Sequence, residues 1–122
     1  MTNTNLKIGD LGEKLACDHL KKLNYIILDK NYHSRFGEID IIAKDKNTIV
    51  FVEVKTRTNL YFGQPQEAVD FFKLKKMAKT IYNYISLNNI RDAIRIDVVA
   101  IELNMKTRRA SLRHFKDALA ES

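Results

Sequence analysis

Three charged side chains lie in two neighbouring apolar segments of this 122-residue chain. Glu53 and Lys55 interrupt the segment FVEVKTRT near its C-terminal end, and Asp40 lies within GEIDIIA. Two carboxylates placed side by side destabilise a fold unless a positive charge lies between them. Mg²⁺ removes that conflict, since it is usually held by one or two carboxylates, with waters and substrate phosphate completing its octahedron. These residue types together indicate metal-assisted chemistry on a phosphate.

Lys55 has two roles open to it at such a site. It can hold or activate an attacking water, or it can offset charge on the phosphate. The alternative is a surface ion pair between Glu53 and Lys55, with Asp40 merely solvated. We favour the metal site because the strand is apolar on both sides through residues 49–52, which predicts a central position in the sheet.

Strand geometry decides whether these side chains meet. Side chains alternate between the two faces of a strand, so Glu53 and Lys55 point to the same side. Segments 38–45 and 48–56 are predicted to form a hairpin in which paired residue numbers sum to about 93. Asp40 then lies opposite Glu53. A slip of one residue in this register would place the two on opposite faces.

The remaining segments complete an α/β domain. A helix over 6–24, three strands, a helix over 67–88 and two further strands predict the order α-β-β-β-α-β-β. The three strands are 25–33, 38–45 and 48–56, and the last two are 94–102 and 108–115. Short turns make the first three strands antiparallel, whereas the second helix is a crossover that brings the fourth strand in parallel. We expect one three-layer domain over 1–122 with a mixed sheet, a loop over 57–66 and a polar tail from about 116.

The charge and composition of the chain limit the classes of partner that it is expected to bind. The chain has 21 Lys+Arg against 15 Asp+Glu, a net charge of +6, and a pI near 9.5. This charge favours a polyanion, although many small proteins are basic for no specific reason. The sequence shows neither a secretory signal nor a membrane span, and Cys17 is the single cysteine. We therefore expect a cytoplasmic protein that does not enter a membrane.

The motifs resemble those of a known superfamily. GEIDII, twelve intervening residues and then EVK resemble the PD-(D/E)xK signature of restriction-endonuclease-like enzymes and archaeal Holliday-junction resolvases. The segments LGEKLA, GEIDIIA, FVEVKTR, FGQPQEAV with Lys73 following, and RIDVVAI occur in the order seen in the YraN-type family of small bacterial endonuclease-like proteins. This resemblance covers nearly the whole chain.

The resemblance implies a role for each matching residue. Asp40 and Glu53 would bind Mg²⁺ or Mn²⁺, and Lys55 would be the catalytic lysine. Glu13 corresponds to a helix glutamate that often completes the site, and the Val54 main-chain carbonyl is a further metal ligand by analogy. The spacing alone places Glu13 at the edge of the apolar stripe of its helix, where a solvated glutamate is equally plausible. Ile39 precedes Asp40 where the superfamily usually has proline.

Four residues are candidates for contact with nucleic acid. They are Lys73 and Lys76 on the second helix, and Arg57 and Gln66 in the segment that follows the third strand. A solvated helix face and ordinary loop packing explain these residues equally well.

Two functions from different classes follow from these residues. The first is a metal-dependent endonuclease that hydrolyses phosphodiester bonds in nucleic acid, with DNA as the expected substrate and branched or junction DNA as one form of it to consider. The alternative is a nucleic-acid-binding module on a nuclease fold, with little or no catalysis, that acts beside DNA repair, recombination or uptake proteins. A third and weaker alternative is a basic adaptor for a protein partner. A homodimer would suit a junction substrate, because symmetrical cleavage requires two sites.

Overall fold

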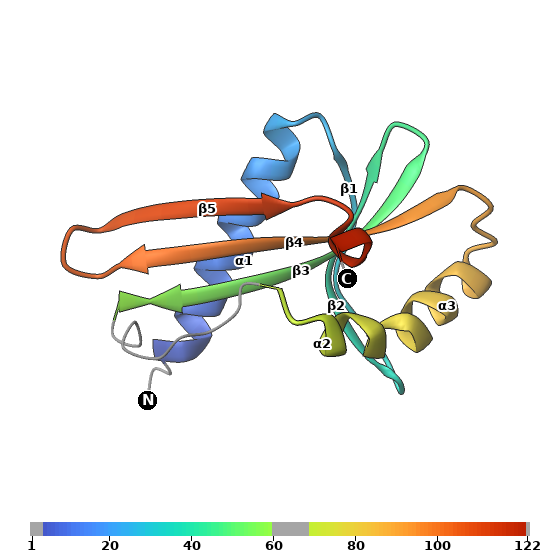
Figure 1. The fold of residues 1–122 in the computed structure, drawn as a ribbon, viewed down its shortest axis with the longest axis horizontal. Helices are drawn as coiled ribbons and strands as arrows, with labels where there is room; N and C mark the ends of the chain where they lie inside the picture. Colours follow the sequence, from blue (N-terminus) through green and yellow to red (C-terminus); the bar gives the residue numbers. More distant parts are fainter. Residues whose placement is uncertain (1–3, 60–68, 122) are drawn as a thin grey trace.

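A five-stranded mixed β-sheet with helices on both faces forms the protein in a computed structural model, which describes residues 4–59 and 69–121 (Figure 1). The elements are α1 (Thr4–Lys22), β1 (Ile26–Ser34), β2 (Gly37–Asp45), β3 (Thr48–Thr58), α2 (Phe71–Lys76), α3 (Ala78–Leu87), β4 (Ala93–Asn104), β5 (Arg109–Phe115) and the short 3₁₀ helix η2 (Ala118–Glu121). The strand order is β1-β2-β3-β4-β5, with β3 and β4 parallel and the other neighbours antiparallel. The predicted α/β class, mixed sheet and crossover are confirmed, and the order is consistent with a restriction-endonuclease-like fold.

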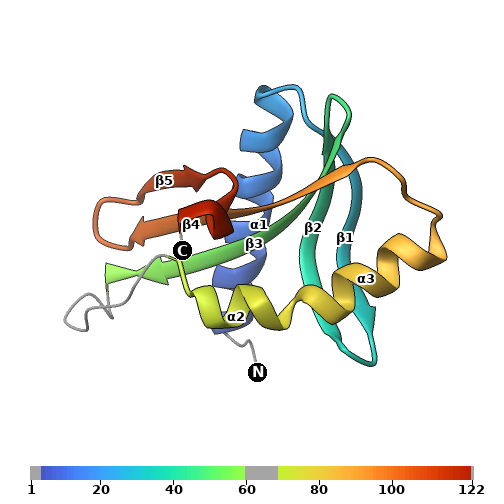
Figure 2. The same cartoon turned by 45° about the vertical axis from the view of Figure 1, so that its right-hand side comes forward.

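Each face of the sheet has its own core, and β3 contributes to both. Val50 and Val52 pack in the cluster under α1, whereas Ile49 and Phe51 pack in the cluster under α2 and α3. All four side chains are buried, as expected for a strand with neighbours on both sides. Figure 2 shows α1 behind the sheet and α2–α3 in front of it. The central position predicted for this strand is therefore confirmed.

A glycine permits α1 to lie directly against β3. A Cβ atom at Gly12 would come within 1.9 Å of Thr56 Oγ1, a separation that real Cβ atoms do not show. Only glycine therefore allows this close approach of helix and strand. The approach fixes the position of the next residue, Glu13, beside the sheet.

The largest differences from the predicted boundaries are at the end of β3 and in the second helix. Arg57 and Thr58, predicted as loop, extend β3, because parallel pairing with β4 continues as far as Thr58 with Leu103. The helix predicted over 67–88 begins only at Phe71 and is divided at Met77. The Met77 N–H bonds to the carbonyl three residues back, a tight turn that separates α2 from α3. Positions 60–68 lie outside the described residues.

A buried charged network ties the sheet to its surroundings. Asp97 is fully buried in β4 and accepts hydrogen bonds from Arg95 Nε at 2.8 Å and from the Asp117 N–H at 3.0 Å. His114 Nε2 lies 2.8 Å from the other carboxylate oxygen of Asp97, Oδ2. The Arg95 guanidinium also donates to the Tyr25 hydroxyl. These partners give Asp97 a structural role. No helix in the described ranges is long and apolar enough to cross a bilayer.

Candidate active site

The ladder between β2 and β3 ends at the predicted site. Its pairs run from Asp45 with Thr48 to Ile41 with Val52, so paired numbers sum to 93 as predicted. The ladder ends there, however, and the predicted pairing of Asp40 with Glu53 is not formed. One position further on, the Val54 N–H donates to Asp40 Oδ2 at 2.8 Å. A side-chain carboxylate here takes the place of the backbone carbonyl that a continued ladder would have supplied. The Asp40 carboxylate thus lies in the gap between two separating strands.

The alternation of side chains along β2 breaks at the same point. Ile41 and Ala43 belong to the core under α1, and Ile42 belongs to the core under α3. Strict alternation would put Ile39 with Ile41, but Ile39 packs in the core under α3. At this break Asp40 lines a cavity together with Gly9 and Glu13 of α1, and its carboxylate accepts from the Val54 N–H.

Glu13 reaches the same place from α1. A cavity of about 230 Å³ is lined by Gly9, Glu13, Asp40, Val54 and Thr56. Glu13 Oε1 is buried there and has no hydrogen-bond partner among residues 4–59 and 69–121. Burial raises the pKa of Glu13, and the negative charges of Asp10 and Glu38 raise it further. The structure therefore brings Glu13 and Asp40 together, and it leaves one buried carboxylate oxygen available to a cation.

The charge conflict expected from the sequence appears in Asp40. Burial raises the pKa of Asp40 to about 6, although the Val54 N–H opposes this shift. The charges of Glu53 and Glu13 raise the pKa further, and Lys73 lowers it. Asp40 thus responds to both of the other carboxylates, which flank it from the two sides of the sheet.

Glu53 projects toward α2, where Lys73 binds it. Lys73 Nζ lies 2.5 Å from Glu53 Oε1, and the Glu53 side chain is only 13% exposed. Burial alone would lower the pKa of Lys73, but the hydrogen bond and charge of Glu53 outweigh it and raise the pKa. Asp70 caps α2 by accepting from the Lys73 N–H and so orients this residue. Lys55 is half-buried, two residues along the same face of β3.

The other predicted nucleic-acid contacts are dispersed. Lys76 lies on the exposed side of α2, with its ammonium 4.3 Å from the centre of the Phe72 ring. Arg57 follows Lys55 on the same face and forms an ion pair of 2.9 Å with Glu102. Gln66 lies outside the described residues. The structure therefore brings Lys73 to the carboxylates and leaves Lys76 at the surface.

The donor set suits a hard divalent cation. Carboxylate and carbonyl oxygens are the ligands of Mg²⁺ and Mn²⁺. In a strand, the N–H and C=O of one residue point the same way, so the Val54 carbonyl faces the gap that holds the Asp40 carboxylate. Within residues 4–59 and 69–121, no three histidine, cysteine or carboxylate side chains form a group that could hold a metal. The donors around Asp40 fit a cation that main-chain carbonyl and water oxygens help to hold.

Two basic residues on β5 were not among the sequence candidates. Arg109 and Arg113 alternate with Ala110 and Leu112, so both lie on the face of the sheet that carries Glu53. The pattern RASLR contains this signal, because residues two apart in a strand share a face. The contact between Lys73 and Glu53 has no such signal, since a loop and a helix start separate the two residues.

The fold and the site together define an α/β protein with an acidic site where two strands of a mixed sheet separate. The model of Uncharacterised protein family UPF0102 matches residues 12–101, and the chain belongs to this family. A UPF0102 protein of Clostridium botulinum (strain Kyoto / Type A2) is 46% identical over 116 residues, covering 93% of this chain and 94% of the relative. A UPF0102 protein of Caldanaerobacter subterraneus subsp. tengcongensis is 48% identical over 106 residues, covering 85% and 87%.

Proposed function

We propose that this protein is a divalent-metal-dependent nuclease of the PD-(D/E)xK type that hydrolyses phosphodiester bonds in nucleic acid, with DNA as the first substrate to test. The observation that carries the proposal is the arrangement at the end of the β2–β3 ladder. Asp40 accepts a hydrogen bond from the Val54 N–H, and the same cavity holds the Glu13 oxygen that has no partner in the described part of the chain. Such a cluster of carboxylates costs stability and is understandable where a cation neutralises it.

The roles of the residues follow from their positions. Asp40, Glu13, Glu53 and the Val54 carbonyl would hold Mg²⁺ or Mn²⁺, which when bound supplies Lewis acidity and a more acidic water. Lys55, half-buried beside Glu53, supplies a positive charge for the attacking water or for the phosphate. Lys73 neutralises Glu53 in the metal-free protein. Because Lys73 occupies one Glu53 oxygen, it must move away if that oxygen is to take the metal.

One observation favours the second function, a binding module without catalysis. Glu53 is already paired with Lys73, and the described part of the chain has no group of three side-chain metal donors. A permanent ion pair at this position would remove a metal ligand and leave the basic surface to bind nucleic acid beside repair, recombination or uptake proteins.

A cleavage screen separates the two functions. Purified protein with Mg²⁺ or Mn²⁺ is incubated with linear duplex, single-stranded, flapped and four-way-junction DNA, and with RNA. We expect cleavage by the wild type and none by Lys55→Ala, while calorimetry shows that Lys55→Ala still binds the metal. Asp40→Asn should lose both properties and remain folded. If no substrate is cleaved, and DNA binding is strong, salt-dependent and unchanged in Asp40→Asn, the binding module replaces the nuclease.

A further inference from the structure

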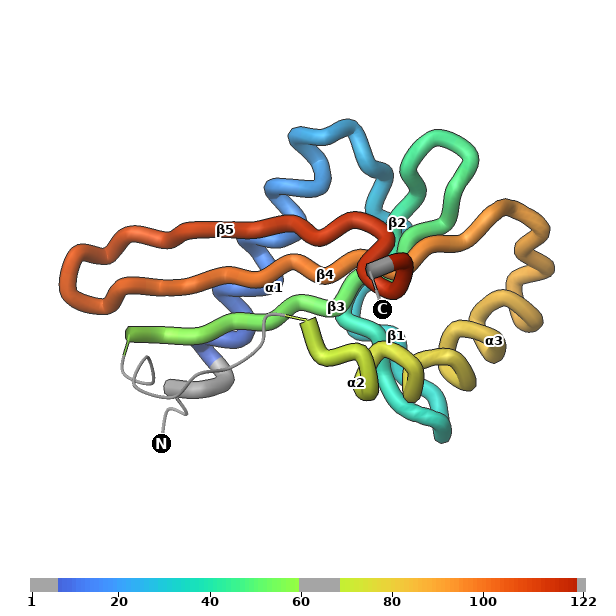
Figure 3. The backbone as a smooth tube through the Cα atoms, viewed as in Figure 1, coloured from blue at the N-terminus to red at the C-terminus, as the bar shows by residue number. Residues whose placement is uncertain are grey.

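The face of the sheet that carries Glu53 and Lys55 continues past α2 and α3. The hairpin of β4 and β5 extends farther to the left than these two helices in the view of Figure 3. Glu102, Arg109, Ser111 and Arg113 on this hairpin are all exposed. A surface therefore begins at the candidate active site and crosses three neighbouring strands.

The register of the strands arranges this surface in rows. Lys55 pairs with Ala100 of β4, and Ala100 pairs with Arg113 of β5. Paired residues of neighbouring strands point to the same face, and strands lie about 4.8 Å apart, so the Lys55 and Arg113 backbones are separated by roughly 10 Å. Ala100, between them, has the shortest side chain in the row. The row therefore has one cation on each side of a small central side chain.

The next two rows each contain an arginine as well. Arg57 pairs with Glu102, and Glu102 with Ser111. The Arg57 guanidinium and the Glu102 carboxylate form an ion pair of 2.9 Å, which cancels the acidic charge within the row. Asn104 pairs with Arg109 in the last row. On this face of β3, β4 and β5, the described basic residues outnumber the acidic ones, with Lys55, Arg57, Arg109 and Arg113 against Glu53 and Glu102.

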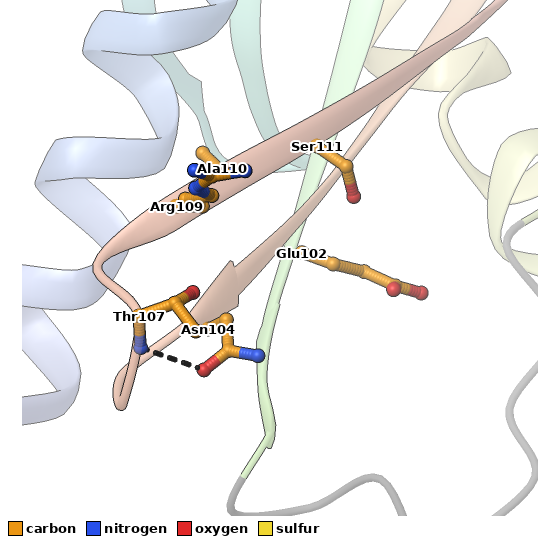
Figure 4. A pocket seen from close by; sticks show the side chains of 6 residues that line it. All are labelled: Glu102, Asn104, Thr107, Arg109, Ala110 and Ser111. Atoms are coloured by element: carbon orange, nitrogen blue, oxygen red, sulfur yellow. Dashed lines mark hydrogen bonds between the residues drawn. The ribbon is translucent and has the colours of Figure 1, made fainter.

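A hollow marks the far end of this surface. Its volume is about 360 Å³, within the range of sites that hold small molecules. It is lined by Glu102, Asn104, Thr107, Arg109, Ala110 and Ser111 (Figure 4). The Asn104 side chain accepts hydrogen bonds from the Lys106 and Thr107 N–H groups, which fixes the turn that carries Arg109. Arg113 is fixed as well, with its guanidinium 4.9 Å from the centre of the Phe115 ring.

We propose that Lys55, Arg57, Arg109 and Arg113 form a binding surface for the sugar-phosphate backbone of nucleic acid, which leads from the candidate active site across β3, β4 and β5. This inference rests on the proposed function, because Lys55 belongs to both. Phosphate contacts position a nucleic acid without reading its sequence, and arginine and lysine supply most of them. The ligand class is therefore a polynucleotide whose backbone follows the open face of the hairpin.

The experiment measures DNA binding in EDTA, where cleavage cannot occur. Fluorescence anisotropy gives the dissociation constant of a labelled duplex and of a labelled single strand at several salt concentrations. Each lost phosphate contact lowers the slope of log K against log salt by about 1. We expect Arg109→Ala/Arg113→Ala to lower the slope by about 2, and Arg109→Lys/Arg113→Lys to retain it. The matched control is Lys14→Ala/Lys21→Ala, which removes the same charge from exposed positions of α1 and should change the slope much less.

The outcomes separate this inference from the proposed function. Circular dichroism first checks that each variant is folded. If the arginine variant keeps the wild-type slope, the binding surface is wrong even where the wild type cleaves DNA. If the arginine variant lowers the slope of log K against log salt but the wild type cleaves no substrate, the binding surface is supported and the proposed nuclease activity is wrong. Equally tight binding of wild type to polyglutamate, lost in the same variant, would overturn nucleic acid as the ligand.

Discussion

Lys73 Nζ lies 2.5 Å from Glu53 Oε1, so a helix lysine neutralises the carboxylate for which a metal role is proposed. The two side chains differ in exposure, 61% for Lys73 and 13% for Glu53. The lysine therefore reaches in from solvent and can leave again without disturbing the core. An ammonium at this carboxylate and a divalent cation compete for the same oxygen.

This competition predicts that Lys73→Gln binds metal more tightly than the wild type. An exposed ion pair is worth up to about 1 kcal/mol, so the affinity for Mn²⁺ should rise by as much as about fivefold. Calorimetry without nucleic acid measures the change. Lys75→Gln, on the exposed side of the same helix, is the control and should have wild-type affinity. Weaker metal binding in Lys73→Gln would show that Lys73 does not compete with the metal.

Asp40→Asn should stabilise the metal-free protein at neutral pH. Burial raises the pKa of Asp40 from 3.8 to about 6, so between these values the folded state holds a proton that the unfolded state has released. Stability therefore falls as pH rises through this window and stays lower above it. Asparagine cannot ionise, and the gain in free energy of unfolding above pH 6 should be on the order of 3 kcal/mol.

Urea unfolding in EDTA at several pH values tests this expectation. The extra free energy of unfolding of Asp40→Asn should vanish near pH 3.8, because the Asp40 carboxyl of the folded wild type is protonated there and carries no charge either. Asp18→Asn, at an exposed position of α1, serves as the control. A gain that is the same at every pH would mean that ionisation of Asp40 is not its cause.

Gly12→Ala should destabilise the protein and displace Glu13. The new Cβ would lie 1.9 Å from Thr56 Oγ1, so α1 must move away from β3. Overpacking of this kind costs about 1–3 kcal/mol. Gly9→Ala is a matched control in the same helix, because its Cβ meets nothing within 4 Å and alanine favours a helix by up to about 1 kcal/mol. Thermal unfolding of both variants measures the difference, and equal melting temperatures would contradict the close approach at Gly12.

Asp97→Asn should cost about 3–5 kcal/mol at neutral pH, since it removes the fully buried counter-charge of the Arg95 guanidinium. Burial would raise the pKa of Asp97, but hydrogen bonds from His114, Arg95 and the Asp117 N–H lower it to about 2. The charged form thus stabilises the fold above the unfolded value of 3.8, and this contribution is lost as pH falls toward 2.

Denaturant unfolding of Asp97→Asn between pH 2 and pH 7 follows this loss. The difference in free energy of unfolding between Asp97→Asn and the wild type should become smaller as the pH falls from 3.8 toward 2. Asp92→Asn removes an exposed partner of Lys44 at 3.7 Å and should change stability by less than about 1 kcal/mol. A cost for Asp97→Asn no larger than that for Asp92→Asn would show that the network adds little to stability.

Periodicity in the sequence was enough to predict the fold class, the hairpin register and the central place of β3. These properties follow from local rules, namely alternation in strands, apolar stripes in helices and short turns. The same rules put Glu53 and Lys55 on one face of their strand, and they would also have put Arg109 and Arg113 on one face of theirs. The missed extension of β3 through Thr58 depended on its pairing with β4, which is a long-range contact.

The sequence by itself therefore determined which residues carry charge and on which strands they lie. Only the tertiary structure decided where those charges point. The break in alternation at Asp40, its bond to the Val54 N–H and the buried Glu13 oxygen all arise where strands separate and a helix packs across the gap. The ion pair of Lys73 with Glu53 likewise depends on where α2 begins. Such contacts join distant segments, and no local pattern encodes them because packing of the whole sheet sets their distances.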